Sequence, residues 1–470
     1  MKIKIVDFGP LKEFEFDLSK NFIVTYGNNN IGKSYAMQMV YLLLKTFIGF
    51  RGMYSAYGSE KYYMMRNIFS GVTNETMGKL IKDFIDSDMQ EKKVTDDVKK
   101  LVFKAMSESI MPEFMSSCNN TFGNFQRTLE QNPYVHLVFD EYKLVIDMKR
   151  GEIDGEIDMF PINLKKTENS MHGSRKCKSH LDVYVYNNEY RRPLAVIYEQ
   201  INKTYSKMLY SIVMNFDQVY FLPASRSGIY SGMNAFGAIV AELSKNRAFL
   251  TKKIELPGIS EPISDYFISL SNIANMYSLR IRGSERLSDY YSKIEDRILK
   301  GKVLFDKSKN ALVYAPSDLD STFEMTEVSS MVSEVSPIVA FLKYIIGVRR
   351  VKGTKRNAIL FIEEPEAHLH PNNQIELIEI FSELASAGLT LVVSSHSNYV
   401  FNKLNNLVLA KKLDYNIYQP IYLEQGSEGS ISRILPIDEC GADDENFVDV
   451  SEKLYNEREQ IIQNLNLGEE

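Results

Sequence analysis

Residues 27–34 read Gly-Asn-Asn-Asn-Ile-Gly-Lys-Ser and match the pattern GxxxxGK(S/T), after an apolar run and before a helix-forming segment. Glycines let successive backbone N–H groups point inward around a phosphate, and the start of a helix adds partial positive charge. Lys33 can reach the β- and γ-phosphates of a nucleotide, and the Ser34 hydroxyl can ligate Mg²⁺. The alternative is a glycine turn followed by a chance Lys-Ser. The sequence therefore predicts a nucleotide-binding loop, whose candidate residues are Asn28, Asn30, Ile31, Gly32, Lys33, Ser34 and Tyr35.

Two carboxylates, Glu363 and Glu364, directly follow the apolar run at 358–362. The carboxyl end of a strand faces the ligand site in an open parallel sheet, so we expect this pair beside the phosphate loop of a neighbouring strand. Glu363 would hold Mg²⁺, directly or through water, and Glu364 would orient or deprotonate the attacking water. The alternative is a solvated strand end without a catalytic role.

A second polar strand end follows the apolar run at 389–394, where Ser394, Ser395 and His396 stand together. Ligands bind at this end of parallel strands. His396 could therefore hydrogen-bond the γ-phosphate and the attacking water. A histidine with a structural role is the alternative, and the position of His396 after an acidic strand favours the functional interpretation.

Hydrophobic patterning predicts the elements that position these residues. Alternating apolar and polar residues predict strands, and long periodic segments without turn residues predict helices. The closing third of the chain alternates strand and helix, which is typical of a largely parallel sheet and of the α/β class. The predicted strands lie at 2–8, 13–17, 22–26, 216–223, 358–362, 389–394 and near 420, with a hairpin at 302–315. The predicted helices begin at Lys33 and after His396 and span 194–214, 331–347 and 373–386.

Composition narrows the class of protein. The chain has 470 residues, with 55 Lys and Arg against 61 Asp and Glu, and its net charge of −6 creates no overall attraction to nucleic acid or anionic lipid. Its three cysteines are widely spaced, which argues against a disulfide framework or a zinc site. No signal peptide or run of about 20 apolar residues is present. We expect a cytoplasmic protein without membrane contact.

Taken together, the phosphate loop, EEPEAHLHP at 363–371 and SSHS at 394–397 resemble the ABC-class ATPases of the SMC, RecF and OLD type over residues 1–50 and 215–430. The resemblance implies ATP and Mg²⁺ as ligands. It also implies an ABC-type head with a mixed central sheet, split by a helical and β insertion that separates Lys33 from Glu363. The expected segments are 1–50 (head, with the phosphate loop), 51–130 (helical insertion), 131–193 (antiparallel β subdomain), 194–228 (head segment), 229–300 (second helical insertion) and 301–470 (head, C-terminal part).

The same resemblance implies a signature segment that caps the nucleotide of a second subunit. Residues 327–334 (EVSSMVSE) open a predicted helix in the expected place. Ser329 and Ser330 would face the γ-phosphate across the dimer with the exposed N–H groups of the helix start. Met331 stands where the family usually has glycine. A plain Ser-rich helix cap is the alternative.

Other resemblances concern single residues. His370 falls where ABC proteins place the D-loop aspartate, and Lys12 falls where related heads place a basic residue near the nucleotide. Gln218 is a candidate Q-loop glutamine. The segment PASR at 223–226 resembles an OLD-type element, which implies that Arg226 contacts nucleotide or a neighbouring subunit.

Two further clusters have simpler interpretations. A solvated loop explains the basic run Arg349, Arg350, Lys352, Lys355 and Arg356 more simply than nucleic-acid binding does. A Lys/Arg-rich loop likewise explains His172, Cys177 and His180 more simply than a metal site does.

The resemblance implies composite active sites between two heads, slow turnover, and therefore at least a homodimer with ATP. Too little chain follows His396 for the TOPRIM domain of full-length OLD nucleases. We therefore expect a separate effector nuclease of TOPRIM or HNH type, as in the anti-phage systems PARIS and Septu, with a phage protein or DNA as trigger. The alternatives are a DNA-repair or chromosome-clamp ATPase, disfavoured by the acidic charge, and a soluble transporter ATPase subunit, disfavoured by the motif spacing.

Overall fold

The computed structural model describes residues 1–56, 72–168, 173–186, 189–213, 216–230, 232, 258–273, 285–309, 311–346, 357–442 and 455–462. The statements below concern these residues. His172 and the basic run at 349–356 lie outside them, so the interpretations offered for these two sites stay predictions.

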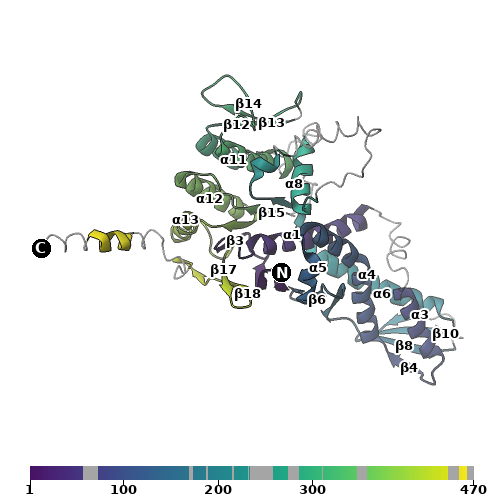
Figure 1. Ribbon diagram of the computed structural model, residues 1–470. Helices are drawn as coiled ribbons and strands as arrows, with labels where there is room; N and C mark the ends of the chain where they lie inside the picture. Colours follow the sequence, from purple (N-terminus) through teal and green to yellow (C-terminus); the bar gives the residue numbers. More distant parts are fainter. Residues whose placement is uncertain are drawn as a thin grey trace, which may run out of the picture.

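The central feature is an eleven-stranded mixed sheet (Figure 1). Its first five strands are parallel; beyond them, neighbours are antiparallel except for the parallel β18–β2 pair. This arrangement confirms the predicted α/β class and mixed sheet. The strands in spatial order are β11 (Phe216–Leu222), β15 (Asn357–Glu363), β16 (Thr390–Ser395), β3 (Phe22–Gly27), β17 (Tyr418–Gly426), β18 (Gly429–Ile434), β2 (Leu11–Asp17), β1 (Lys2–Phe8), β5 (Tyr134–Val138), β6 (Tyr142–Asp147) and β7 (Glu152–Ile157).

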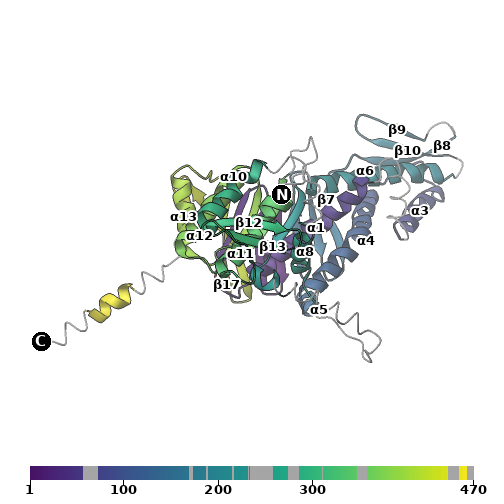
Figure 2. The ribbon, with the colours of Figure 1, turned by 90° about the horizontal axis from the view of Figure 1, so that it is seen from above.

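Both faces of the parallel strands are buried, which explains their continuous apolar runs. Successive side chains of β3 enter different cores: Ile23 packs into one, and Phe22 and Val24 pack into the other. One core contains α1 (Lys33–Ala56), α4 (Thr95–Thr121) and α6 (Arg191–Val213). The opposite core contains α8 (Glu261–Ser271), α11 (Ser330–Ala340), α12 (Pro371–Ser386) and α13 (Asn398–Leu409) (Figure 2). The helices thus hold the strand ends at a fixed edge.

The segment expected to form an antiparallel β subdomain divides between two sheets. Strands β5, β6 and β7 pair antiparallel as expected, but they extend the central sheet through β1. The second sheet has the order β4 (Glu91–Lys93), β8 (Ile162–Thr167), β10 (Leu181–Tyr186) and β9 (Ser174–Lys176). Strand β10 lies between β8 and β9. It pairs parallel with β8 and antiparallel with β9, whereas the sequence predicted antiparallel pairing throughout. Alternating residues reveal a strand but not its partner.

The second sheet lies in an outer lobe with α3 (Val72–Ile85), away from the head (Figure 1). Strand β4 occurs in a segment expected to be helical. A short helix, α5 (Phe125–Glu130), leads from α4 back to β5. The domain boundaries drawn from the sequence stay predictions.

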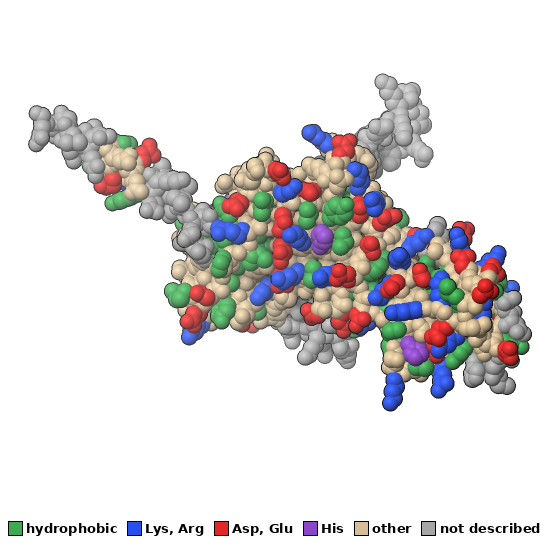
Figure 3. Space-filling model, turned by 90° about the horizontal axis from the view of Figure 1, so that it is seen from below, with side chains coloured by type: hydrophobic (Ala, Val, Ile, Leu, Met, Phe, Trp, Pro, Cys, Tyr) green, Lys and Arg blue, Asp and Glu red, His purple; other side chains and the backbone are tan. Residues whose placement is uncertain are grey.

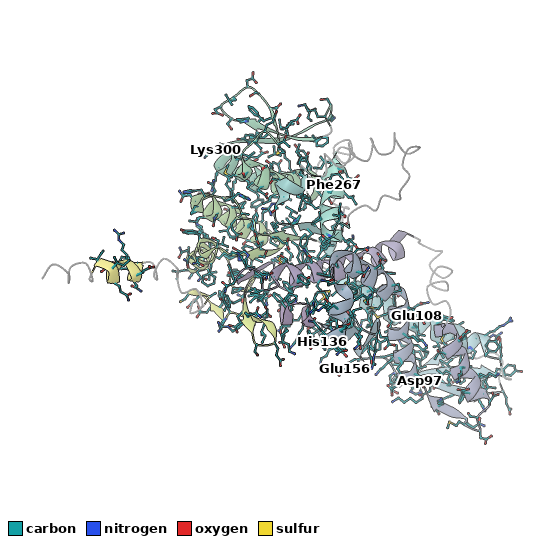
Figure 4. The ribbon with its side chains drawn as sticks, viewed as in Figure 1. Asp97, Glu108, His136, Glu156, Phe267 and Lys300 are labelled. Carbon is teal, nitrogen blue, oxygen red and sulfur yellow. The ribbon has the colours of Figure 1, made fainter. Side chains whose placement is uncertain are left out.

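The remaining elements include a three-stranded sheet and several short helices and strands. The predicted hairpin is confirmed as β12 (Gly301–Asp306) and β13 (Ala311–Pro316). A third strand, β14 (Phe323–Glu324), pairs with β13. The helix expected at 331–347 begins as α11 and becomes a π-helix, η4, at Phe341–Ile346. Figure 4 places Lys300, beside this hairpin, and His136, on β5, on opposite sides of the molecule. Other short elements are α10 (Glu285–Lys293), η3 (Ile294–Leu299), β19 (Ile437–Asp438), β20 (Gly441–Ala442) and a helix at 455–462.

Within the described residues, no helix combines the length and the apolar character that a bilayer span requires.

Candidate nucleotide-binding and catalytic site

The carboxyl ends of three neighbouring strands bring the predicted motifs to one edge. Strand β16 lies between the acidic strand β15 and the loop strand β3, so the acidic strand is not the direct neighbour that the sequence analysis expected. The register pairs Glu363 with Ser394, and Ser395 with Tyr26. The segment carrying His396 therefore stands between the carboxylates and the phosphate loop.

The loop itself has the backbone that phosphate binding requires. Gly27 and Gly32 have φ values of +141° and +101°, and Asn30 also has a positive φ of 62°. A Cβ atom on Gly27 would lie 2.5 Å from the carbonyl oxygen of Leu423, so no larger residue fits there. The helix α1 begins at Lys33, directly after the loop.

The neighbours of the loop divide into exposed and packed residues. Asn28, Asn30 and Ser34 are exposed, whereas Ile31 is buried. The ring of Tyr35 packs against Phe122 with a centroid distance of 5.1 Å. The side chain of Tyr35 is thus part of the core packing. Only the backbone amide of Tyr35, in the first turn of α1, is left to contact a ligand.

Lys33 is a buried cation held by the loop. Its Nζ donates to the carbonyl oxygens of Gly27 at 2.8 Å and Asn28 at 2.6 Å and lies 3.2 Å from Nδ1 of His396. Burial lowers the pKa of Lys33 to about 8, and the charges of Glu364 and Glu366 partly oppose this shift. Anionic phosphates would replace neutral carbonyls as its partners.

His396 connects this cation to a carboxylate. Its Nε2 lies 3.2 Å from Oε1 of Glu364. Because an ammonium group can only donate, Nδ1 accepts from Lys33, and the neutral imidazole then carries its proton on Nε2 and donates to Glu364. The hydrogen bond from His396 lowers the pKa of Glu364, which keeps that carboxylate ionised. The structure thus brings Lys33, His396 and Glu364 into one continuous set of contacts, while their catalytic roles stay predictions.

Glu363 and Ser34 form the candidate metal site. Glu363 is 5% exposed, and its Oε2 accepts a hydrogen bond of 3.1 Å from the amide of Ala224. Burial raises the pKa of Glu363, and the Ser34 hydroxyl beside it acts in the opposite direction. Its buried Oε1 has no hydrogen bond of regular geometry with any residue that the structure describes. A buried carboxylate oxygen in need of a partner, next to a hydroxyl, fits the oxygen ligands that Mg²⁺ prefers.

Glu366 lies at this edge beside His396, and the sequence analysis did not name it. Its Oε1 accepts hydrogen bonds of 2.7 Å from the Ser395 hydroxyl and 2.7 Å from the His396 amide. The side chain is nearly buried. It therefore fixes the backbone that carries His396. In the sequence, Glu366 could have been noticed as a third carboxylate, three residues after Glu363, in the turn that follows the acidic strand.

Arg226 does not have the position that its motif implied. Its side chain is fully buried and ion-paired with Glu334, so it cannot contact a neighbouring subunit in this conformation. Contact with a neighbouring subunit is therefore contradicted, because the segment after β11 folds inward against α11. Contact with nucleotide stays a prediction. The sequence alone does not indicate a partner for Glu334, which is the only charged residue of α11.

The candidate signature residues lie at the start of α11. Ser329 is the N-cap, and its hydroxyl accepts a hydrogen bond of 3.4 Å from the amide of Val332. Ser329 and Ser330 are exposed at this helix start. The side chain of Met331 is contacted by Asn373 at the start of α12. The hydroxyl of Ser329 thus serves as an ordinary helix cap, and its role towards a second subunit stays a prediction.

Two further candidates have other partners. Lys12 forms ion pairs with Asp7 at 2.9 Å and Glu428 at 3.1 Å, which raise its pKa. Gln218 lies within β11 opposite Ala358, before the carboxyl end of the strand, and accepts a hydrogen bond from the Tyr220 hydroxyl. This position does not fit a Q-loop residue.

The remaining histidines lie in the turn before α12. His370 is exposed and is the N-cap of that helix, and its Nδ1 lies 3.4 Å from the amide of Asn372. His368 is also exposed, in a polar turn, and has a positive φ of 63°.

A second group of metal-ligating side chains lies in the outer lobe. Atoms of Cys177, His180 and Asp182 fall within 4.8 Å of one another. However, the carboxylate of Asp182 already has Lys165 at 3.0 Å and His180 at 3.3 Å. Burial alone would raise the pKa of Asp182, but the hydrogen bond and charge of Lys165 lower it. The group forms a salt-bridged turn, and the interpretation offered for His172, Cys177 and His180 stays a prediction.

Comparison with known proteins identifies a family for this chain. The family model described as "AAA ATPase domain" matches residues 1–401. No curated protein matches the sequence. The chain is similar to an SmcHead bound to the C-winged helix domain of ScpA, with 9% identity, a TM-score of 0.38, and coverage of 92% of this chain and 97% of that one.

Two further solved structures show a comparable, distant likeness. The SMC head domain from Thermotoga maritima has 10% identity and a TM-score of 0.34 and covers 93% of this chain and 98% of its own. The Smc head domain from Pyrococcus furiosus, bound to the C-terminal domain of ScpA, has 11% identity and a TM-score of 0.34 and covers 98% of both chains.

Proposed function

This chain belongs to the AAA ATPase domain family, and from that premise we propose that it binds ATP with Mg²⁺ at the carboxyl edge of β3, β16 and β15 and hydrolyses it. The observation that carries the proposal is the set of contacts from Lys33 through His396 to Glu364. The set links the candidate phosphate-binding ammonium of Lys33, the imidazole of His396 and the candidate base Glu364 at the ends of the three strands. A phosphate-binding cation and a carboxylate base are two of the groups that hydrolysis of a γ-phosphate requires.

The residues have distinct tasks in this proposal. Lys33 exchanges the carbonyl oxygens of Gly27 and Asn28 for phosphate oxygens. Glu364, ionised because of His396, accepts a hydrogen bond from the attacking water and takes its proton as the bond to phosphorus forms. Release of Nδ1 by Lys33 leaves the ring of His396 free to turn, and its Nε2–H can then donate to the γ-phosphate instead of Glu364. Bound Mg²⁺, held by Glu363 and Ser34, would neutralise charge on the β- and γ-phosphates.

We also propose that the site is completed by a second copy of the chain, as the ABC-class resemblance implies. Ser329 and Ser330 are exposed at the start of α11, where backbone N–H groups can meet an anion. ATP would then hold two heads together, and hydrolysis would separate them.

The dimer is tested with the variant Glu364→Gln, which should bind ATP and accumulate as a dimer in analytical ultracentrifugation. Adding Ser329→Arg should remove the dimer and hydrolysis while ATP affinity is retained. Ser179→Arg, an exposed site in the outer lobe, is the control for the added charge. A monomer under all conditions with ATP would rule out the shared site.

For the biological role, we propose an ATP-gated scaffold of an anti-phage system that holds or releases a separate effector nuclease of TOPRIM or HNH type. Support comes from the sequence resemblance and from the outer lobe of α3, β8 and β10, which offers a surface beyond the head (Figure 1). On the face seen in Figure 3, acidic and basic side chains of the described residues are interspersed, without the broad basic area that a DNA clamp presents.

Co-purification with the product of an adjacent gene, lost or gained with ATP, tests this role. A salt-sensitive affinity for duplex DNA that depends on ATP, without a protein partner, would instead support the DNA-clamp alternative.

A further inference from the structure

We propose that Arg226 is a positioning residue for ATP hydrolysis: it fixes Glu364 in its working geometry and joins Glu364 to the signature helix α11 of the same chain. The inference rests on the proposed function for its kinetic consequence. Its structural basis is independent of that function.

The guanidinium of Arg226 donates hydrogen bonds to backbone carbonyl groups at the ends of two strands. Its Nη1 donates to Pro223 at 3.1 Å and to Glu363 at 2.7 Å, and its Nη2 donates to Glu364 at 3.3 Å. Pro223 directly follows β11, Glu363 is the last residue of β15, and Glu364 directly follows β15. Strand ladders end here, so the carbonyl oxygens of Pro223 and Glu363 need donors from elsewhere, whereas that of Glu364 also accepts from the amide of Ala367 at 3.1 Å. Only the planar fork of arginine offers so many donors in one place.

The contact to Glu364 matters because the backbone of that residue is strained. Glu364 has a φ of +42°, which residues other than glycine rarely adopt. Its amide donates to the carbonyl oxygen of Ser394 at 3.1 Å, and its own carbonyl accepts from Arg226. The residue is thus held from both sides, by β16 and by Arg226. This backbone conformation aims the carboxylate at His396.

The other half of the connection is Glu334, one turn into α11. Its carboxylate accepts hydrogen bonds from the amides of Arg226 at 2.9 Å and Ser227 at 3.2 Å and from the Ser227 hydroxyl at 2.6 Å. Nε of Arg226 donates to the backbone carbonyl of Glu334 at 3.0 Å. Both charges are buried, at 0% and 1% exposure, so each depends on the other for compensation.

These contacts make one connected path within a single chain. Ser329 and Ser330 begin α11, Glu334 follows one turn later, Arg226 links it to the end of β15, and Glu364 stands at that end. A shift of α11 when its start meets a nucleotide on another copy would therefore move the backbone of Glu364. Hydrolysis in one head would depend on engagement of the signature of that same head.

The test compares variants of the full-length protein. Arg226→Lys keeps the charge but cannot reach all the carbonyl groups. Tyr266→Phe is the matched control, because the Tyr266 hydroxyl donates to the backbone carbonyl of Arg226 at 3.3 Å in the same buried cluster but does not touch the strand ends. Three quantities are measured for each: kcat, the Kd for ATP, and amide hydrogen exchange of the peptide 362–366.

We expect Arg226→Lys to lower kcat about 10- to 100-fold while the Kd for ATP changes by less than about twofold, because a displaced base loses rate but not binding. Exchange in the peptide 362–366 should become faster. Tyr266→Phe should lower the melting temperature while leaving kcat and this exchange within about twofold of wild type. The same loss of kcat in Glu334→Gln would support the path to α11.

Wild-type kcat in folded Arg226→Lys would overturn the positioning role, and so would an equal loss of kcat in Tyr266→Phe. If Arg226→Lys does not fold, Glu334→Gln decides: wild-type kcat there refutes the link to α11. If the wild-type protein hydrolyses no ATP, the proposed function fails instead. Exchange in the peptide 362–366, compared between Arg226→Lys and Tyr266→Phe, still shows whether Arg226 holds Glu364.

Discussion

Raising the pH from 7 to 9 should weaken ATP binding, because ATP requires Lys33 in its charged form. Burial lowers the pKa of Lys33 to about 8 in the nucleotide-free protein. Bound phosphates favour the ammonium form and so raise this pKa. Above pH 8, binding must therefore take up a proton, and affinity falls as the pH rises.

The magnitude follows from that pKa. With a value of about 8, about nine-tenths of Lys33 is charged at pH 7 and about one-tenth at pH 9, so the Kd should rise about tenfold, or about 1.4 kcal/mol. The expected proton uptake on binding is close to none at pH 7 and close to one at pH 9.

Isothermal titration calorimetry with a non-hydrolysable ATP analogue and Mg²⁺ measures both quantities when it is repeated in buffers of different ionisation enthalpy. Lys33→Arg, which stays charged over this range, should bind more weakly but without the pH dependence. Lys12→Met removes an exposed, ion-paired lysine and should keep the wild-type slope. A Kd for the wild type that is constant from pH 7 to 9, or a slope that persists in Lys33→Arg, would refute the reasoning.

Three further changes test the site. Glu364→Gln should lower kcat at least about 100-fold without weakening ATP binding, as followed by phosphate release and equilibrium binding; unaltered turnover would remove Glu364 as the base. Glu366→Ala should lower kcat about tenfold, because the backbone of His396 loses an acceptor, and should cost about 1–3 kcal/mol in chemical denaturation; wild-type kcat would contradict this role. Gly27→Ala should abolish ATP binding and cost about 1–3 kcal/mol, because the new Cβ would meet the carbonyl oxygen of Leu423 in a positive-φ conformation. Normal binding by Gly27→Ala would show that the loop has another backbone conformation.

The sequence by itself determined the elements whose signal is local. The phosphate loop is one contiguous segment, and its glycines, its lysine and the helix that follows are neighbours in the chain. The strands that carry Glu364 and His396 could be placed because apolar runs alternate with helices, and parallel strands present their carboxyl ends at one edge. The α/β class followed from the same alternation.

Only the tertiary structure decided which remote groups meet. The place of β16 between β15 and β3, and the parallel pairing of β10 with β8, depend on partners that a strand's own residues do not specify. Arg226 and Glu334 stand 108 residues apart, and each would read as a surface charge without the other. Burial makes their pairing obligatory, because an unpaired charge in the core would be too costly, but that burial exists only once the chain has folded.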